Sequence, residues 1–518
     1  MDLLLNLLAF VFSLGLIVAL HELGHFFFAK RASILCFEYA VGMGPVIWST
    51  RKGETQYAIR AIPIGGFVSM AGEQDLSVVL KKGEKVGLNL ENGEVKEFIL
   101  GDFQTADIEM VVSHYDLYDR DQKGLYIEGT VDDKDTFLTV KKDAFYVFSK
   151  KKKLQVAPYE RSFESKTLWQ RFLTIFAGPA MNFVLAFFLF LIVASIQGKP
   201  LNVNKVGNVI EGNPAFIAGL QDNDQIIRIG SVDVSNWQDI GTALQSVSGE
   251  SNVLIRVIRN NQTIDLTANP RVDINSMGLS NFTGTVINGS NNGAIVGSAY
   301  GKAGDLLADG DIITSVKLDD IIYPISSWVD LVDFAKTTNG GSVFVTFTRG
   351  TETKTVNWIV WENEVLDSQG VPSVTTTIGI EPDFRFDFGY AIMSGFTGIG
   401  DSVNQVIAVL GLLFGGSDQI GLNDLSGPVG IFNIVGQYAK QGLGAFLWFV
   451  AFLSVNIGVM NLLPIPALDG GRLVFLGIEA VIRRPLNKKV ENTANNVMFF
   501  LLMALFVYVT FFDILRLF

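Results

Sequence analysis

Four segments of this chain are long and apolar, and they limit what it can fold into. They cover residues 3–29, about 172–196, about 444–463 and about 497–517. A helix that crosses a bilayer needs roughly 20 apolar residues, so each segment is long enough to span one. Backbone groups in the bilayer must be hydrogen-bonded within the protein, which favours helices. The sequence therefore predicts a polytopic α-helical membrane protein with four transmembrane helices.

Composition supports a membrane protein that also has large polar parts. The chain has 518 residues, of which 49% are hydrophobic and only 18% are charged. Its net charge is −12 and no broad basic surface is evident, so we expect no nucleic-acid partner. Cys36 is the only cysteine, which excludes an internal disulfide and a cysteine-based zinc site. Any metal must be held by His, Asp or Glu, and the chain has three histidines.

The first apolar segment resembles a secretory signal peptide in its length. However, Asp2 stands where a basic residue is expected, and no small-residue cleavage site follows. We therefore expect an uncleaved membrane helix over residues 1–30, with a processed signal as the alternative.

Lysine and arginine near the ends of the segments predict the orientation, because they favour the cytoplasmic side. Such residues follow the first segment, precede the second, and fill the loop between the third and fourth. They are Lys30, Arg31, Lys166, Arg171, Arg472, Arg483, Arg484, Lys488 and Lys489. We expect residues 30–170 and 470–496 in the cytoplasm, with residues 198–443 and both termini outside.

A further segment, residues 384–441, is amphipathic and rich in glycine. Asp401, Asn404 and Gln405 interrupt its apolar pattern. We predict that it lies in the membrane interface. The alternative, a fifth span, breaks the orientation derived above.

The outer region contains an internal repeat of about 90 residues. The stretch AGLQDNDQIIRIGSVDVSNWQDI (218–240) resembles AGDLLADGDIITSVKLDDIIYPISSWVDL (303–331), and a β-rich tail follows each. The matching pairs are Asp224 with Asp311, Trp237 with Trp328, and Arg259 with Arg349. The pattern resembles PDZ domains, so we expect two PDZ-like α+β domains over residues 203–275 and 281–365. Peptide binding at a sheet edge and a purely structural role both stay open.

The inner region is expected to be rich in β-structure. Residues 31–75 are predicted to form a membrane-associated β-hairpin region, and residues 76–160 a cytoplasmic β-rich insertion. The stretch 55–72 alternates like a strand and offers either an edge for an added strand or a plain hairpin. His114 lies in the insertion, and we treat it as an ordinary surface residue.

The first apolar segment carries HELGH, a His-Glu-x-x-His motif. His21 and His25 are four residues apart, so they share one face of a helix and can bind one Zn²⁺. Glu22 is placed to take a proton from the metal's water. Ionisable groups inside a span cost several kcal/mol without a purpose, which argues against a chance match.

A catalytic zinc site takes three protein ligands, so a third ligand is expected elsewhere. Asp469 is the best candidate, because it lies near the inner end of the third segment, on the same predicted side as the histidines. Pro464 and Pro466 break a helix before it, and Gly470 and Gly471 permit a tight turn after it. Taken alone, Asp469 is also compatible with an ordinary turn aspartate.

Together these motifs resemble the intramembrane zinc metalloproteases of the site-2 protease family, in the bacterial form with tandem PDZ domains. The resemblance rests on HELGH and on NLLPIPALDGG (461–471). Further matches are VGMGP (41–45), YAIRAIPIGGFVSMAGE (57–73), ERSFESKTLWQRFLTIFAGPAMNF (160–183) and SGPVGI (426–431). From the apolar segments, we place the second, third and fourth transmembrane helices within residues 161–197, 442–470 (with LDGG) and 496–518.

The resemblance also implies roles for residues. His21, His25 and Asp469 are expected to ligate Zn²⁺, with Glu22 as the catalytic base. Asn461 corresponds to a family asparagine implicated in substrate binding, and Pro464 beside it is assigned to the same group. The implied activity is regulated intramembrane proteolysis of single-span membrane proteins, such as anti-sigma factors, cell-division proteins or signal-peptide remnants, with the PDZ domains filtering substrate ectodomains.

The implied location is the bacterial inner membrane, with the active site toward the cytoplasm. We expect the lipid bilayer and single-span substrates as partners, and a chain that acts as a monomer. Two other functions are compatible with parts of the sequence. A non-catalytic PDZ scaffold with a structural metal site does not need Glu22. A zinc or small-solute transporter is expected to show repeated membrane halves, whereas the repeat here lies in the polar part.

Overall fold

The structure is a computed structural model that describes residues 2–72, 80–100, 106–119, 124–149, 152–283, 287–368, 370–415, 421–422 and 425–516. The chain forms two compact units, described separately below. Unit 1 contains Met1–Leu189 and Ser426–Phe518, and unit 2 contains Phe190–Leu425. The boundary predicted between residues 75 and 76 lies outside the described residues.

Within the described part of the chain, five helices are long and apolar enough to cross a membrane. They are α1 (Asp2–Arg31), α2 (Leu168–Gln197), α8 (Phe388–Phe414), α10 (Leu443–Leu462) and α12 (Lys488–Leu515). This finding supports a polytopic membrane protein. Four of the helices overlap the predicted apolar segments, while α8 falls in the segment predicted to be interfacial. The number of spans therefore stays a prediction.

Two helix boundaries differ from the sequence-based ones. The sequence places LDGG in the third transmembrane segment, but α10 ends at Leu462 and Asp469 begins a separate helix, α11 (Asp469–Ile482). Pro464 and Pro466 lie between the two helices, where each removes a backbone donor. Helix α12 begins at Lys488, before the predicted residue 496, because Asn487 caps its polar first turn.

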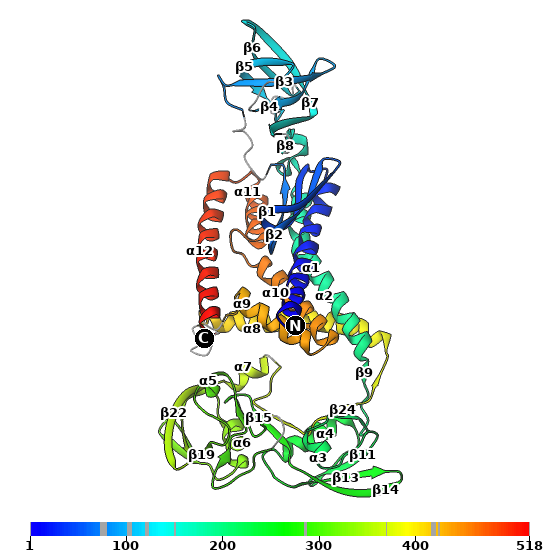
Figure 1. The fold of residues 1–518 in the computed structure, drawn as a ribbon, viewed down its shortest axis with the longest axis vertical. Coiled ribbons are helices and arrows are strands. Elements are labelled where there is room, and N and C mark those ends of the chain that lie inside the picture. Colours follow the sequence, from blue (N-terminus) through cyan, green and yellow to red (C-terminus); the bar gives the residue numbers. More distant parts are fainter. Residues whose placement is uncertain are drawn as a thin grey trace. The chain divides into compact units, whose positions relative to one another are not determined.

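A long β-hairpin packs against α1 in unit 1. Its strands β1 (Cys36–Lys52) and β2 (Thr55–Met70) are antiparallel and carry several register shifts. The Tyr39 hydroxyl donates to the Ala19 carbonyl at 2.6 Å, which ties β1 to α1. Figure 1 shows this hairpin beside α1 in blue.

The inner insertion forms a small closed barrel. Five antiparallel pairings join its strands in the order β4-β3-β5-β6-β7-β8, and a parallel pairing of β4 with β7 closes the circle. Leu88, Phe98 and Ile127 are fully buried at its centre. The strands are β3 (Lys85–Glu91), β4 (Glu94–Ile99), β5 (Ile108–Asp116), β6 (Tyr126–Val131), β7 (Lys134–Ser149) and β8 (Lys152–Gln155).

Short elements complete unit 1. The chain returns from the barrel to α2 through two 3-10 turns, η2 (Tyr159–Arg161) and η3 (Phe163–Ser165). Helix α9 (Pro428–Lys440) precedes α10 and packs against α1, α10 and α12.

Unit 2 contains two similar β-rich modules. In module 1 the sheet order is β12-β11-β13-β14, and in module 2 it is β17-β19-β21-β22 with β20 on β19. The elements of module 1 are β10 (Val206–Val209), α3 (Pro214–Ile217), β11 (Gln225–Ile229), β12 (Val232–Asp233), α4 (Trp237–Ser246), β13 (Val253–Arg259) and β14 (Gln262–Ala268). Those of module 2 are β17 (Ala294–Ile295), α5 (Gly301–Gly304), β19 (Ile312–Leu318), β20 (Ile321–Pro324), α6 (Trp328–Thr337), β21 (Gly341–Arg349) and β22 (Glu352–Val360).

The matched residues of the sequence repeat occupy matched places in the two modules. Arg259 donates two hydrogen bonds to the buried Asp224 carboxylate, at 2.6 and 2.7 Å. Arg349 does the same to buried Asp311, at 2.7 and 2.8 Å. Helices α4 and α6 begin at the paired tryptophans, and each starts with a capping box.

The modules exchange strands across the predicted boundaries. Strand β24 (Ile380–Pro382) returns from the far end of unit 2 to pair with β10 of module 1. Strand β15 (Arg271–Ile274) falls inside the predicted residues 203–275, yet its buried Val272 and Ile274 pack in the core of module 2. The partners of β15 are β16 (Leu279–Ser280) and β23 (Val374–Thr377), and β18 (Ser298–Ala299) extends the sheet.

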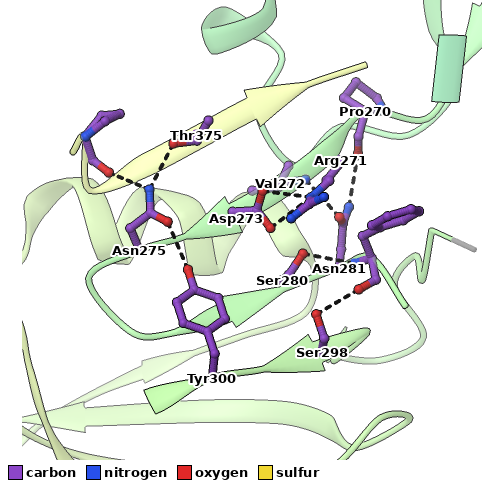
Figure 2. A network of polar contacts seen from close by, with 12 residues as sticks. Pro270, Arg271, Val272, Asp273, Asn275, Ser280, Asn281, Ser298, Tyr300 and Thr375 are labelled. Carbon is purple, nitrogen blue, oxygen red and sulfur yellow. Dashed lines mark hydrogen bonds and ion pairs between the residues drawn. The ribbon is translucent and has the colours of Figure 1, made fainter. Parts of the chain in front are cut away.

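A polar network stabilises this shared sheet, as Figure 2 shows. The buried Asn281 side chain accepts from the Val272 backbone N–H at 2.8 Å and donates to the Pro270 carbonyl at 3.1 Å. Asn275 donates to Thr375 Oγ1 at 2.9 Å, which adds a side-chain contact to β23. Unit 2 also contains β9 (Lys199–Pro200), α7 (Asn363–Ser368) and β25 (Phe384–Arg385).

Candidate metal centre

Three side chains predicted as metal ligands meet inside unit 1. The Nε2 atoms of His21 and His25 are 3.2 Å apart. Asp469 Oδ2 lies 3.2 Å from His21 Nε2 and 3.3 Å from His25 Nε2. Both histidines are buried, and Asp469 is nearly so. Residues more than 440 positions apart in the chain therefore offer one donor atom each to a common point.

The size of this triangle fits zinc. Tetrahedral zinc holds nitrogen and oxygen ligands at about 2.0–2.1 Å, which places neighbouring donor atoms about 3.3 Å apart. Two imidazoles and one carboxylate are also a known donor set for catalytic zinc, in which a fourth position stays open for water or substrate. The three residues thus suit a catalytic ion in both chemistry and spacing.

His25 is oriented by helix α2. Its Nδ1 lies 2.8 Å from the Thr174 carbonyl, so Nδ1 donates there and Nε2 is left unprotonated toward the cluster. Gly178 makes this approach possible, because a Cβ atom at that position would lie 2.1 Å from His25 Nε2. Gly24 of α1 likewise allows α1 and α2 to approach closely, since a Cβ atom there would lie 2.2 Å from the Ala177 carbonyl oxygen.

His21 is oriented by Asn182 of the same helix. The Asn182 amide Nδ2 lies 3.3 Å from His21 Nδ1, while its buried Oδ1 has no hydrogen-bond partner among the described residues. The two ends of an amide have the same shape, and exchanging them places the acceptor oxygen against His21 Nδ1. His21 Nδ1 then donates to Asn182 Oδ1, and its Nε2 faces the cluster as a ligand must.

Asp469 is the first residue of α11, and a tight loop delivers it there. The loop folds back over Gly470 and Gly471, whose Cβ atoms would lie 2.2 Å from the Leu463 oxygen and 2.3 Å from the Ile465 oxygen. Asn495 of α12 accepts a hydrogen bond from the Ala467 backbone N–H at 3.0 Å. The glycines after Asp469 are therefore required by close packing as well as by turning.

A cavity of about 440 Å³ opens beside the cluster. Glu22 is buried and lines it, together with His21. Strand β2 approaches closely at Gly66, where a Cβ atom would lie 2.9 Å from Glu22 Cγ. The remaining lining residues are Leu14, Val18, Gly65, Ser426, Gly427, Pro428, Ile431, Ile457, Asn461 and Phe506.

Of the two predicted substrate-binding residues, one lines this cavity and the other does not. Asn461, near the end of α10, lines it together with Glu22. Pro464 lies in the loop between α10 and α11 and is absent from the lining. The sequence-based reasoning missed Thr174, Gly178 and Asn182, although they lie in one of the stretches that carry the family resemblance. Their signal was a polar or small residue on an otherwise apolar helix.

Comparison with known proteins identifies the family. The model of Peptidase family M50 matches residues 9–505 of the chain. This chain belongs to peptidase family M50. Because M50 is the family of the site-2 proteases, the resemblance noted in the sequence is confirmed.

Curated relatives agree over the full length. The chain is 32% identical to the zinc metalloprotease RasP of Oceanobacillus iheyensis, over 99% of each protein. It is 31% identical to the zinc metalloprotease RasP of Geobacillus kaustophilus, over 99% of this chain and 98% of that protein. It is 32% identical to the regulator of sigma-W protease RasP of Bacillus subtilis, over 99% of each.

The M50 chain is an intramembrane zinc metalloprotease, and Zn²⁺ is its cofactor. It is embedded in a membrane, in a family that acts on membrane-protein substrates. Because the chain is a protease, the transporter and the non-catalytic PDZ scaffold considered from the sequence are both excluded. The clustered residues His21, His25 and Asp469 are suited to that ion by the spacing described above.

Proposed function

We propose that this M50 protease carries out regulated intramembrane proteolysis with His21, His25 and Asp469 as its zinc ligands. One observation carries the proposal. Three donor atoms from α1 and α11 lie 3.2–3.3 Å from one another, and the cavity beside them is lined by Glu22. A structural metal site does not need an acid next to an open cavity, whereas a hydrolytic site does.

Glu22 is the proposed general base. When bound, zinc supplies the electrophile that polarises a peptide carbonyl and acidifies a water molecule. Glu22 takes the proton from the attacking water and later delivers it to the leaving amine. Its position next to His21 on α1 keeps the carboxylate at the cavity wall.

Asn461 and strand β2 are proposed to hold the unwound substrate. A membrane helix pairs its own amides, so it must unwind locally before a peptide bond can be cleaved. Asn461 lines the cavity, and its amide both donates and accepts, which suits a peptide backbone. Among described residues, Gly66–Met70 at the end of β2 pair on one side only, with β1, so their other edge is available for strand addition. Pro464 contributes to substrate binding indirectly, because it prevents α10 from continuing far past Asn461.

The proposed setting is the bacterial cell membrane, with the cleavage site toward the cytoplasm. The relatives are bacterial proteins, and lysine and arginine cluster around Lys30 and Lys488. We place the two PDZ-like modules outside, where they filter the ectodomains of single-span substrates. One relative is named for regulation of sigma-W, which supports anti-sigma factors as a substrate class, with signal-peptide remnants as another.

The test replaces Glu22 with Gln in the full chain. The chain is placed in lipid vesicles with a single-span substrate, and cleavage is followed on gels. We expect a loss of about 10²–10⁴-fold, because a carboxamide cannot accept the proton. Glu211→Gln, the same substitution at an exposed position of unit 2, is the control and should cleave the substrate at the wild-type rate. Cleavage by Glu22→Gln at the wild-type rate would overturn the assigned role.

A further inference from the structure

Helix α12 begins with a polar stretch that the proposed mechanism does not use. Its residues 488–496 include three asparagines, whereas the rest of the helix is strongly apolar. The three are Asn492, Asn495 and Asn496, and all of them line a second cavity of about 400 Å³, called the asparagine cavity below. An amide side chain both donates and accepts hydrogen bonds, so this wall suits a polar, uncharged ligand.

The asparagine cavity lies beside the loop that delivers Asp469. Ala467 of that loop lines the cavity, and Asn495 accepts a hydrogen bond from the Ala467 backbone N–H at 3.0 Å. Asn492 and Asn496 are exposed residues on the same wall. Asn495 therefore holds the loop, while the amides of Asn492 and Asn496 are accessible to a ligand.

The charged residues of the cavity favour neither sign. Arg171 lines it but donates to Glu479 at 2.8 Å, and Lys488 forms an ion pair with Glu164. Such mutually paired charges do not select a cationic or an anionic side chain. A peptide backbone, which is polar and uncharged, is the ligand that this lining suits best.

The open edge of β2 leads from the cavity next to Glu22 to the asparagine cavity. Gly66 lines the first cavity, and Gly72, two residues past the end of β2, lines the second. Between them the strand pairs on one side only, with β1, among the described residues. Six residues of strand span about 20 Å. A substrate strand added along this edge, with its scissile bond beside Glu22, therefore reaches the asparagine cavity about six residues away.

Lys488 joins two walls of the asparagine cavity. Its Nζ atom donates to the Gly72 carbonyl at 3.3 Å, which ties the first turn of α12 to the chain after β2. Gly72 has a φ of +90°, and a Cβ atom there would lie 3.0 Å from Ser162 Cβ. The end of the open edge is thus held against the helix that carries the asparagines.

We propose that the asparagine cavity is a remote substrate subsite. It takes the extended substrate chain where that chain leaves the edge of β2, on the cytoplasmic side of the scissile bond. The amides of Asn492 and Asn496 hydrogen-bond the substrate backbone there, so the subsite tolerates different side chains but requires sufficient length. This inference rests on the proposed function, in particular on strand addition to β2.

The experiment compares wild type with the double variant Asn492→Ala/Asn496→Ala, each as the full chain in lipid vesicles, on two single-span substrates. The long substrate keeps its cytoplasmic segment. The short one ends three residues beyond the scissile bond on that side, so it does not reach the cavity. We expect the double variant to raise KM for the long substrate by about tenfold, because two hydrogen bonds are lost. KM for the short substrate, kcat and zinc content should stay at their wild-type values. Thr493→Ala, an exposed position of α12 outside the lining, is the control.

Three outcomes would overturn the proposal. They are an unchanged KM for the long substrate, an equal rise in KM for both substrates, as a merely structural role of the asparagines predicts, and a loss of zinc. If the double variant fails to accumulate, the single variants Asn492→Ala and Asn496→Ala replace it, each with an expected rise of about threefold. A wild-type chain that cleaves neither substrate would instead refute the proposed function, so the two failures are distinguishable.

Discussion

At the residue scale, Gly178 tests how closely α2 must approach the metal centre. A methyl group at this position would overlap His25 Nε2, the atom that faces the cluster. We expect Gly178→Ala to displace the imidazole and to lower zinc affinity by at least about tenfold, the usual cost of disturbing residues that orient a ligand. Zinc titration of the purified chain, stripped of metal and competed with a chelator, measures this.

Gly477→Ala is the matched control for Gly178→Ala. Gly477 also lies within a helix, α11, but a Cβ atom there meets nothing within 4 Å. This substitution should leave zinc affinity unchanged. Equal zinc affinity in both variants would contradict the packing described for His25.

The residues that carry chemistry could be predicted, but those that orient them could not. HELGH indicates its own function, because two histidines and a glutamate in an apolar helix are costly unless they form a site. Asp469 needed its proline and glycine neighbours as well as the family resemblance. Asn182 and Thr174 have no such pattern, since their roles depend on where α2 crosses α1, which local sequence does not encode.

At the element scale, the turn of the β1–β2 hairpin is held by an ion-pair cluster. Arg161 donates to both oxygens of Glu54, at 2.7 and 2.8 Å, and Lys30 also contacts it. These hydrogen bonds from Arg161, with the charge of Lys30, lower the pKa of Glu54 to about 2. Glu54 therefore stabilises the fold in full above its ordinary pKa of 4.5, and this stability is lost as the pH falls toward 2.

We predict that Glu54→Gln lowers the stability by about 1 kcal/mol at neutral pH, after allowance for its solvent exposure. The difference from wild type should shrink as the pH falls from 4.5 toward 2. Thermal unfolding of the detergent-solubilised chain across this pH range measures it, with Glu84→Gln at an exposed position of the barrel as control. A difference that grows as the pH falls would contradict the sign argued here.

Element types followed from the sequence more readily than element boundaries. Apolar length and the paired Asp, Trp and Arg positions indicated the helices and the repeat. The strand exchange in unit 2 was not foreseen. Strand β24 joins β10 from about 170 residues away, and short strands of this kind have no local pattern that reveals a distant partner. The sequence predicted a helix break at Pro464 and Pro466. The third transmembrane helix was nevertheless predicted within residues 442–470, a range that extends past this break.

At the scale of the whole molecule, the orientation in the membrane depends on α8. If α8 lies in the interface, as proposed, the chain before it and the chain after it are on the same, outer side. We predict that cysteines placed singly at Phe386 and Leu422, in a Cys36→Ser background, both react with an impermeant maleimide added outside intact cells. Reaction of the Leu422→Cys variant only after the cells are opened would show that α8 crosses the bilayer.

The most direct test of the account measures zinc content and substrate cleavage on the same preparations. The variants are wild type, Glu22→Gln and Asp469→Ala, each as the full chain in lipid vesicles. We predict one zinc ion per chain with cleavage for wild type, the same zinc content without cleavage for Glu22→Gln, and loss of both for Asp469→Ala. Full zinc content in Asp469→Ala, or cleavage by Glu22→Gln, would contradict the central claim that these residues form the proteolytic centre.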